Sequence, residues 1–221
     1  MTSRIAGLYA ITPDLIDTED LLRRTRAALA GGARILQYRN KTATPELRLA
    51  QARRLQQLCA EFAVPLIIND SAKLALEVGA AGAHLGSDDG DLAAARARLG
   101  PDKLLGASCY DRIELAQRAI AAGADHVAFG SFFASGVKPD AVRPPMDLIS
   151  RAKHELGVPT VAIGGITTTN APQLIAAGID AIAVITALFA APDVERAARE
   201  FRMLFDQPPY GSSHEEKSKA L

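Results

Sequence analysis

Residues 159–187 read PTVAIGGITTTNAPQLIAAGIDAIAVITA, and this stretch contains the pattern that decides the fold. A β-rich run over Pro159–Ile166 is followed by a helical pattern over Thr169–Ala177 and then by a second β-rich run over Ala181–Thr186. A strand, a helix and a strand joined by short turns predict a βαβ unit with parallel strands. Gly178, just beyond the helical pattern, is typical of a helix end.

The same alternation recurs along the whole chain. Helical patterns rich in Ala, Leu and Arg separate the β-rich runs, and the last of them spans about Pro192–Phe205. Eight parallel strands with intervening helices favour a closed (β/α)₈ TIM barrel, an α/β fold. A doubly wound open sheet is the alternative, but Ala10–Asp14 stands where a G-x-G-x-x-G loop would be expected. The six β-rich runs that precede the unit above are Gly7–Thr12, Arg34–Arg39, Pro65–Asp70, Ala83–Gly86, Leu104–Cys109 and His126–Phe133.

A single domain is expected over residues 1–206, because no linker or low-complexity insert divides the chain. Residues 207–221 are polar and are predicted to form a disordered tail. Cys59 and Cys109 are the two cysteines of the chain, and two free thiols are favoured over a disulfide.

Charge and hydropathy exclude several classes of partner. Lys plus Arg number 25 and Asp plus Glu number 25, so no broad basic face for nucleic acid is expected. The longest apolar stretch, near residues 181–191, is too short for a membrane span, and the N-terminus lacks a secretory segment. We therefore expect a cytoplasmic enzyme that acts on small phosphorylated molecules, and the sequence leaves open whether it forms a homodimer.

Polar residues at the strand ends predict a site for a magnesium-bound diphosphate. Gln37, Arg39 and Lys41 are two residues apart, so a strand would direct all three side chains to one face. Asp70 and Asp89 follow the third and fourth β-rich runs. Mg²⁺ is typically held by one or two carboxylates together with waters and phosphate oxygens. In a barrel these strand ends all lie at one mouth.

Each of these segments also has a structural explanation. Cations at a strand end can extend into solvent, and Asp89 or Asp91 can cap the following helix. Asp88 is a competing metal ligand next to Asp89. His84 lies in an apolar run, where a structural role is at least as well supported as that of a catalytic base. The sequence shows no Ser–His–Asp set and no zinc-ligand spacing.

Two later segments predict further contacts with anions. Residues 130–139, GSFFASGVKP, place Ser135 and Lys138 in a loop that could close over an anionic substrate. Gly164–Gly165 and Ile185–Thr186 follow the seventh and eighth strands, where barrels often bind phosphate through backbone N–H groups. The alternatives are a surface loop for the first segment and a tight turn that packs a helix for the second.

Taken together, these segments resemble the thiamine-phosphate synthase family, also called thiamine-phosphate pyrophosphorylase. The resemblance implies that 4-amino-5-hydroxymethyl-2-methylpyrimidine diphosphate condenses with a thiazole phosphate, usually the carboxylated tautomer, to give thiamine phosphate and diphosphate. The matching segments, in order over nearly the whole chain, are QYRNK at 37–41, ND at 69–70, HLGSDD at 84–89, GAS at 106–108, AIGGI at 162–166 and VIT at 184–186.

The resemblance also implies roles for individual positions. Asp70 and Asp89 would bind one Mg²⁺, and Arg39, Lys41, Ser108 and Lys138 would act in catalysis. The pyrimidine diphosphate would be bound by Gln37, Tyr38, Arg39, Asn40, Lys41, Asn69, Ser108 and Lys138. The thiazole phosphate would be bound by Ser135, Gly136, Val137, Gly165, Ile185 and Thr186.

The loop before Lys138 departs from the family pattern. The family usually reads P-T-x-T-K or P-S-x-T-K there, whereas this chain reads ASGVK over residues 134–138. Val137 cannot hydrogen-bond, which costs an acceptor there about 0.5–1.5 kcal/mol. The departure keeps two alternatives open: a thiazole tautomerase on the same barrel and a non-catalytic protein that binds a thiazole phosphate. The joint presence of strand-end cations and carboxylates favours the synthase.

Overall fold

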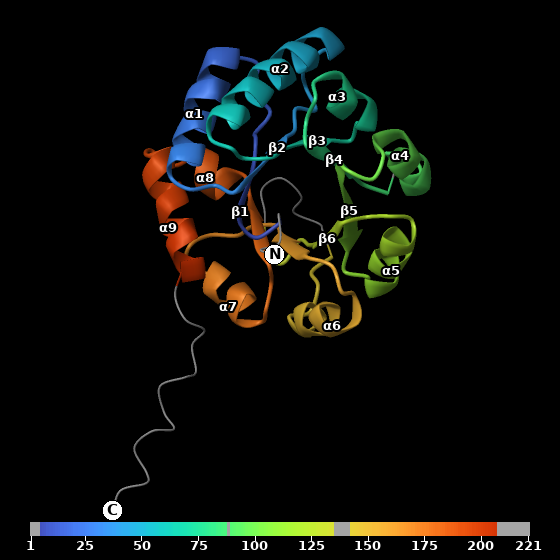
Figure 1. Ribbon diagram of the computed structural model, residues 1–221. Helices are drawn as coiled ribbons and strands as arrows, with labels where there is room; N and C mark the ends of the chain where they lie inside the picture. The colour runs from blue at the N-terminus through green and yellow to red at the C-terminus, as the bar shows by residue number, and fades with distance from the viewer. Residues whose placement is uncertain (1–4, 88, 135–141, 207–221) are drawn as a thin grey trace, which may run out of the picture.

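The computed structural model describes residues 5–87, 89–134 and 142–206, and its eight parallel strands close into a barrel in sequence order. Helices surround the strands as a ring (Figure 1). The predicted (β/α)₈ fold is therefore confirmed. The strands are β1 Gly7–Ile11, β2 Ile35–Tyr38, β3 Leu66–Asn69, β4 Gly82–Leu85, β5 Leu104–Tyr110, β6 His126–Phe129, β7 Thr160–Ile163 and β8 Ala181–Val184.

The helices follow the predicted pattern with one addition. Thr44 caps α2 by accepting a hydrogen bond from the backbone N–H of Leu47, and Pro45 is the first residue of that helix. The added helix, α8, has four residues, too few to show a helical period in the sequence. The helices are α1 Thr18–Ala30, α2 Pro45–Glu61, α3 Ala72–Glu77, α4 Leu92–Leu99, α5 Ile113–Ala121, α6 Asp147–Glu155, α7 Ala171–Ala176, α8 Thr186–Phe189 and α9 Val194–Asp206.

The last described helix, α9, ends at Asp206, and the predicted tail at 207–221 lies outside the described residues. Among the helices of the described ranges, none combines the length and the apolar composition that crossing a bilayer requires. Cys59 and Cys109 are both buried and free, as predicted.

The strand register places polar side chains of different strands in one row. Pairing of β1 with β8, where Tyr9 lies opposite Ala183, closes the barrel. On the other side, His84 of β4 lies opposite Gly106 of β5, and Gly106 lies opposite His126 of β6. Residues far apart in the sequence therefore meet inside the barrel.

Apolar side chains pack in two layers, one between strands and helices and one inside the barrel. The inner layer combines bulky residues of β1 to β3 with smaller residues of β6 to β8. Gln37, His84 and His126 are buried polar residues. His126 begins β6, as predicted, and its ring packs near those of Tyr9 and His84. The inner cluster consists of Ile5, Tyr9, Ile11, Ile35, Ile67, Ala128, Val161, Ala181 and Ala183.

Candidate active site

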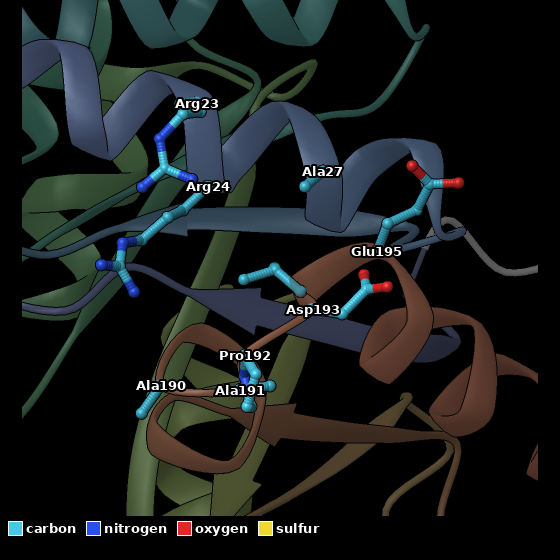
Figure 2. Close-up of a pocket in the computed structure, with 9 residues that line it drawn as sticks. Arg23, Arg24, Ala27, Ala190, Ala191, Pro192, Asp193 and Glu195 are labelled. Carbon is cyan, nitrogen blue, oxygen red and sulfur yellow. The ribbon is translucent and has the colours of Figure 1, made fainter.

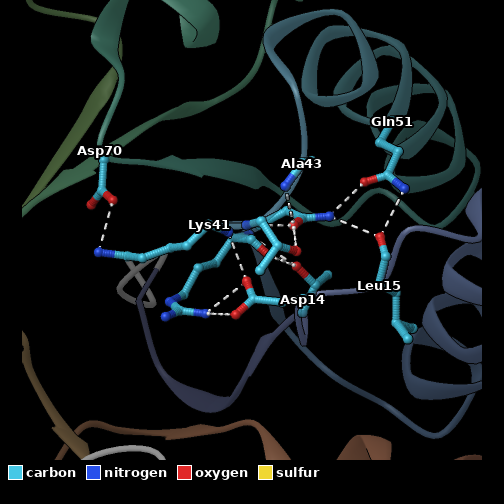
Figure 3. A network of polar contacts seen from close by, with 10 residues as sticks. Asp14, Leu15, Lys41, Ala43, Gln51 and Asp70 are labelled. Atoms are coloured by element: carbon cyan, nitrogen blue, oxygen red, sulfur yellow. Dashed lines mark hydrogen bonds and ion pairs between the residues drawn. The ribbon is translucent and has the colours of Figure 1, made fainter.

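Asp14, in the loop after β1, holds the cations at the end of β2 (Figure 3). Arg39 Nη1 donates to both carboxylate oxygens of Asp14 at 2.9 Å, and the backbone N–H of Lys41 donates to Oδ1 at 2.7 Å. The Arg39 backbone N–H donates to Thr12 Oγ1, which in turn donates to the Arg39 carbonyl, both at 2.9 Å. The first loop therefore fixes where Arg39 and Lys41 stand.

The side chains of Tyr38 and Asn40 form hydrogen bonds with Gln51 of α2 and with the loop after β1. Tyr38 Oη donates to Gln51 Oε1 at 2.7 Å. Asn40 Nδ2 donates to the Leu15 carbonyl at 2.8 Å and to Gln51 at 3.1 Å, and Asn40 Oδ1 accepts from the Ala43 N–H at 3.0 Å. Both residues also line the cleft beside the charged rim, and their contact with substrate stays a prediction.

Lys41 reaches from β2 to the carboxylate after β3. Its Nζ lies 3.3 Å from Asp70 Oδ2 (Figure 3). The Asp70 backbone N–H donates to the His84 carbonyl of β4 at 2.8 Å. Asp70 has φ 62°, a left-handed conformation that aspartate tolerates better than most residues. Such backbone strain is often found where a side chain must point at a ligand.

Asp89, in the loop after β4, lies close enough to Asp70, after β3, for the two carboxyl groups to interact electrostatically. Burial raises the pKa of Asp70, the Asp89 carboxylate raises it further, and Lys41 opposes both. Asp89 Oδ2 also accepts from the Gly86 N–H at 2.7 Å. The helix cap is Asp91, which accepts from the Ala94 N–H, so capping is not the task of Asp89.

This donor set fits a hard divalent cation. Two mutually repelling carboxylates beside one ammonium leave a deficit of positive charge, and Mg²⁺ uses one or two carboxylates with waters and phosphate oxygens. Within the described part of the chain, no three His, Cys, Asp or Glu side chains cluster as a complete metal site. Waters or substrate would therefore supply the other ligands. Asp88, the competing ligand, lies outside the described residues.

Below this charged rim lie uncharged polar side chains inside the barrel. Gln37 Nε2 donates to Tyr9 Oη at 3.0 Å, and His84 Nε2 lies 3.0 Å from Ser108 Oγ. Burial raises the pKa of Tyr9 and lowers the pKa of His84 to about 4, so both groups are neutral at pH 7. Asn69 ends β3 opposite His84. The uncharged side chains inside the barrel are thus suited to a neutral ring, and the charged rim is suited to a charged group attached to that ring.

A cleft of about 430 Å³ opens beside this rim and is lined in part by Lys41, Asn69 and Asp70. Arg48 and Lys73 line it from the flanking helices together with Glu46 and Glu77, so the charged lining carries both signs. The cleft therefore begins at the predicted diphosphate and metal residues and continues between α2 and α3.

A larger cavity, of about 550 Å³, lies between α1 and the connection from α8 to α9 (Figure 2). Its charged lining carries both signs, with Arg23 and Arg24 from α1 and Asp193 and Glu195 from the other wall. Arg24 Nη1 donates to the Phe189 carbonyl at 2.8 Å. None of the predicted site residues in the described ranges lines it, so we assign the chemistry to the smaller cleft.

The glycine pair after β7 has a steric role. Gly164 and Gly165 have φ 103° and 61°. A Cβ on Gly164 would collide with Ser131 Oγ, and a Cβ on Gly165 would collide with the Ala134 carbonyl oxygen. The pair therefore lets the segment after β6 pack on the end of β7, where the Phe133 N–H donates to the Gly164 carbonyl at 3.0 Å.

The remaining predicted residues divide into two groups. Ile185 precedes α8 and Thr186 is its first residue, so both stand at the end of β8. The other group, Ser135, Gly136, Val137 and Lys138, lies outside the described residues. The predicted thiazole phosphate site is therefore described only on its β7 and β8 side.

The comparisons with known proteins agree with this geometry. Residues 8–188 match the family model described as thiamine monophosphate synthase. The chain belongs to this family. Two relatives are thiamine-phosphate synthases: one from Methylobacillus flagellatus is 55% identical over 202 residues, which are 91% of this chain and 96% of the relative. The other, from Nitrosospira multiformis, is 51% identical over 209 residues, covering 95% and 89%.

A solved structure of the same family also resembles this chain. Thiamine phosphate pyrophosphorylase from Pyrococcus furiosus aligns with a TM-score of 0.82 and 32% identity, over 92% of this chain and 97% of that one. A 3-hexulose-6-phosphate synthase aligns with a TM-score of 0.67 and 19% identity, over 90% and 99%, and shares the fold alone. The chain is thus an enzyme of thiamine biosynthesis in the transferase class.

Sequence reasoning missed three residues of this site: Tyr9, Asp14 and Gln51. Gln51 is fully buried in α2, and a polar residue on the inward face of a helix is a signal that the sequence does contain. Asp14 follows a proline in the first loop, which indicates a turn but not its partner. Tyr9 reads simply as part of a β-rich run.

Replacing Asp14 tests its role in holding the rim cations. We expect Asp14→Asn to lower kcat/KM by about 10-fold or more, because hydrogen bonds to a charged group contribute about 1.5–3 kcal/mol. Asp17→Asn is the matched control in the same loop, since Asp17 only caps α1 and Asn caps equally well. Steady-state kinetics measure kcat/KM of both variants. Equal losses of kcat/KM in the two variants would contradict the role of Asp14 in holding the rim cations.

Proposed function

We propose that this enzyme condenses the aminopyrimidine methyl diphosphate with a thiazole phosphate, releases diphosphate, and uses Mg²⁺, in the cytoplasm. The proposal rests above all on one observation, the meeting of Lys41, Asp70 and Asp89 at the mouth of the barrel. Arg39 stands beside them, held by Asp14. A compact ammonium, a guanidinium fork and two carboxylates suit a metal-bound diphosphate better than any neutral ligand.

The reaction needs charge stabilisation more than covalent help from the protein. The bond between the pyrimidine methylene carbon and the diphosphate oxygen breaks, and its electron pair leaves with diphosphate. The lone pair of the thiazole nitrogen then forms the new carbon–nitrogen bond. Arg39 and Lys41 hold the departing anion, and bound Mg²⁺ would neutralise part of its charge.

The interior of the barrel would hold the pyrimidine ring. An electron-rich aminopyrimidine stabilises the methylene cation, and a positive side chain close to the ring would oppose that stabilisation. Because burial keeps His84 neutral, the floor beside Ser108 does not oppose this cation. Gln37 and Ser108 supply hydrogen bonds there, so the ring can be oriented before the bond breaks.

The proposal is tested by incubating the protein with both substrates and Mg²⁺ and detecting the products by mass spectrometry. We expect thiamine phosphate and diphosphate in equal amounts, complete loss of product with a chelator, and recovery with excess Mg²⁺. A tautomerase would convert the thiazole without releasing diphosphate, and a binding protein would leave both substrates unchanged. Condensation that persists in chelator would refute the metal assignment.

A further inference from the structure

One buried amide side chain, that of Gln51 in α2, forms hydrogen bonds both with the loop after β1 and with the end of β2. Gln51 is 0% exposed, and it shares the inward face of the helix with the apolar residues Leu55 and Leu58. Burying an amide is costly unless its N–H and C=O groups form hydrogen bonds. The role of Gln51 therefore follows from the bonds that its two ends make.

The nitrogen of the Gln51 amide holds the loop after β1. Gln51 Nε2 donates to the Leu15 carbonyl at 3.0 Å (Figure 3). It also lies 3.3 Å from the Ile16 carbonyl and from Thr18 Oγ1. Because a carbonyl oxygen can only accept, these contacts fix which end of the amide faces the loop. Leu15 directly follows Asp14, so Gln51 holds the chain beside the carboxylate that binds the rim cations.

The oxygen of the same amide holds the end of β2. Gln51 Oε1 accepts from Tyr38 Oη at 2.7 Å and from Asn40 Nδ2 at 3.1 Å. The orientation of the Asn40 amide is fixed as well, because its Nδ2 donates to the Leu15 carbonyl and its Oδ1 accepts from backbone N–H groups. Tyr38 and Asn40 are the two chain neighbours of Arg39. One oxygen atom of Gln51 thus holds the chain on both sides of Arg39.

Both ends of the Gln51 amide therefore act on Arg39. The amide oxygen holds the neighbours of Arg39, and the amide nitrogen holds the loop of Asp14, whose carboxylate accepts from the Arg39 guanidinium at 2.9 Å. The same carboxylate accepts from the Lys41 N–H at 2.7 Å. Gln51 is not among the residues that line the cleft, so it would affect a substrate there through these partners.

We propose that Gln51 is a positioning residue: it holds the loop after β1 against the end of β2, and so keeps Arg39 and Lys41 where they meet an anionic substrate. The substrate in this statement rests on the proposed function, whereas the hydrogen bonds of Gln51 do not. A displacement of about 1 Å in a group that contacts the reacting molecule can slow a reaction about 100-fold. Loss of the Gln51 amide should therefore reduce activity as well as stability.

The first test is hydrogen–deuterium exchange of the full chain without substrate. Gln51→Met keeps the length of the side chain and removes both hydrogen-bonding ends. In this variant we expect faster exchange in the peptides that cover residues 12–18 and 38–43, and unchanged exchange in β6 to β8. Exchange in these two segments that equals the wild type would overturn the proposal.

Leu55→Ala is the matched control for Gln51→Met. Leu55 is also buried and lies one turn further along the same face of α2. Its truncation should destabilise the barrel without singling out residues 12–18 and 38–43. Selective exchange of these two segments in Leu55→Ala would show that any damage to α2 releases them, and would overturn the specific role of Gln51.

A measurement on the wild type keeps the proposal falsifiable if Gln51→Met does not fold. By NMR, the side-chain amide protons of Gln51 should exchange with water at least about 10-fold more slowly than those of Gln57, which is exposed on the same helix. Equal exchange rates for the two amides would show that the bonds of Gln51 to the loop do not persist, and would overturn the proposal.

The kinetic test asks whether Gln51 acts through Asp14. We expect Gln51→Met to lower kcat/KM for the pyrimidine diphosphate about 10-fold and to leave KM for the thiazole phosphate within about twofold of the wild type. In the double variant with Asp14→Asn, kcat/KM should stay within about twofold of the less active single variant, because both changes remove the same support of Arg39. A loss in the double variant that equals the product of the two single losses would overturn the proposal.

These experiments separate the failure of this inference from the failure of the proposed function. Selective exchange of residues 12–18 and 38–43 in Gln51→Met, together with no condensation by the wild type, would defeat the proposed function alone. Condensation by the wild type, together with unchanged exchange and unchanged kcat/KM in Gln51→Met, would defeat the positioning role alone.

Discussion

Asp70→Asn is expected to lower kcat by at least about 100-fold while leaving the barrel folded. The substitution removes one of the two carboxylates of the proposed metal site, and with it the partner of Lys41 at 3.3 Å. Asn keeps the size of the side chain and tolerates φ 62° as well as Asp does. Steady-state kinetics at saturating Mg²⁺ measure the loss, and a wild-type kcat would contradict the metal role.

The direction in which Asp70→Asn changes the stability of the folded protein can also be predicted. The pKa of Asp70 is raised in the folded protein by burial and by Asp89. A carboxyl group whose pKa is higher folded than unfolded destabilises the folded state at pH values above both, so its charge costs stability at pH 7. Without metal, Asp70→Asn should therefore melt at the wild-type temperature or above it. Asp206→Asn, on the exposed end of α9, is the control that should change neither property.

Lys41→Met is expected to have the second largest effect, a loss of about 100-fold in kcat/KM. The ammonium lies 3.3 Å from Asp70 Oδ2, and in the proposed reaction it would meet the departing diphosphate. Lys41 also lowers the pKa of Asp70.

A second Lys–Asp pair provides the control for Lys41→Met. Lys153 of α6 pairs with Asp180, which precedes β8 and so lies at the end of the barrel away from the site. Lys153→Met should leave kcat/KM within about twofold of the wild type, since exposed ion pairs contribute little. Comparable losses in both variants would show that the effect comes from protein charge in general and not from this site.

The barrel could be predicted from the sequence because each strand is a short apolar run bounded by turn residues. The residues at which the strands end were harder to predict. The run His126–Phe133 continues beyond β6, which ends at Phe129, because Phe132 and Phe133 remain apolar and at least partly buried. Their N–H groups pair with the Ile163 and Gly164 carbonyls beyond the ends of the strands. Apolar character reports burial, and burial does not require membership of the sheet.

The site was predictable where alternation along one strand decides direction. Gln37 lies within β2 and bonds Tyr9 inside the barrel, whereas Arg39 and Lys41 follow the end of β2 at Tyr38 and are held by Asp14. Contacts that depend on the closed fold were not predictable. Asp14 meets Arg39 across 25 positions, and His84 meets Ser108 across 24. No local pattern encodes such pairs, because only the closure of the barrel brings the strands together.

A crystal structure grown with Mn²⁺ and diphosphate tests the central claim most directly. Mn²⁺ substitutes for Mg²⁺ at oxygen sites and is located by its anomalous scattering. We predict one metal peak at about 2.1 Å from carboxylate oxygens of Asp70 and Asp89, with the diphosphate between that metal and Lys41. A metal bound elsewhere, or diphosphate bound away from the mouth of the barrel, would contradict the account.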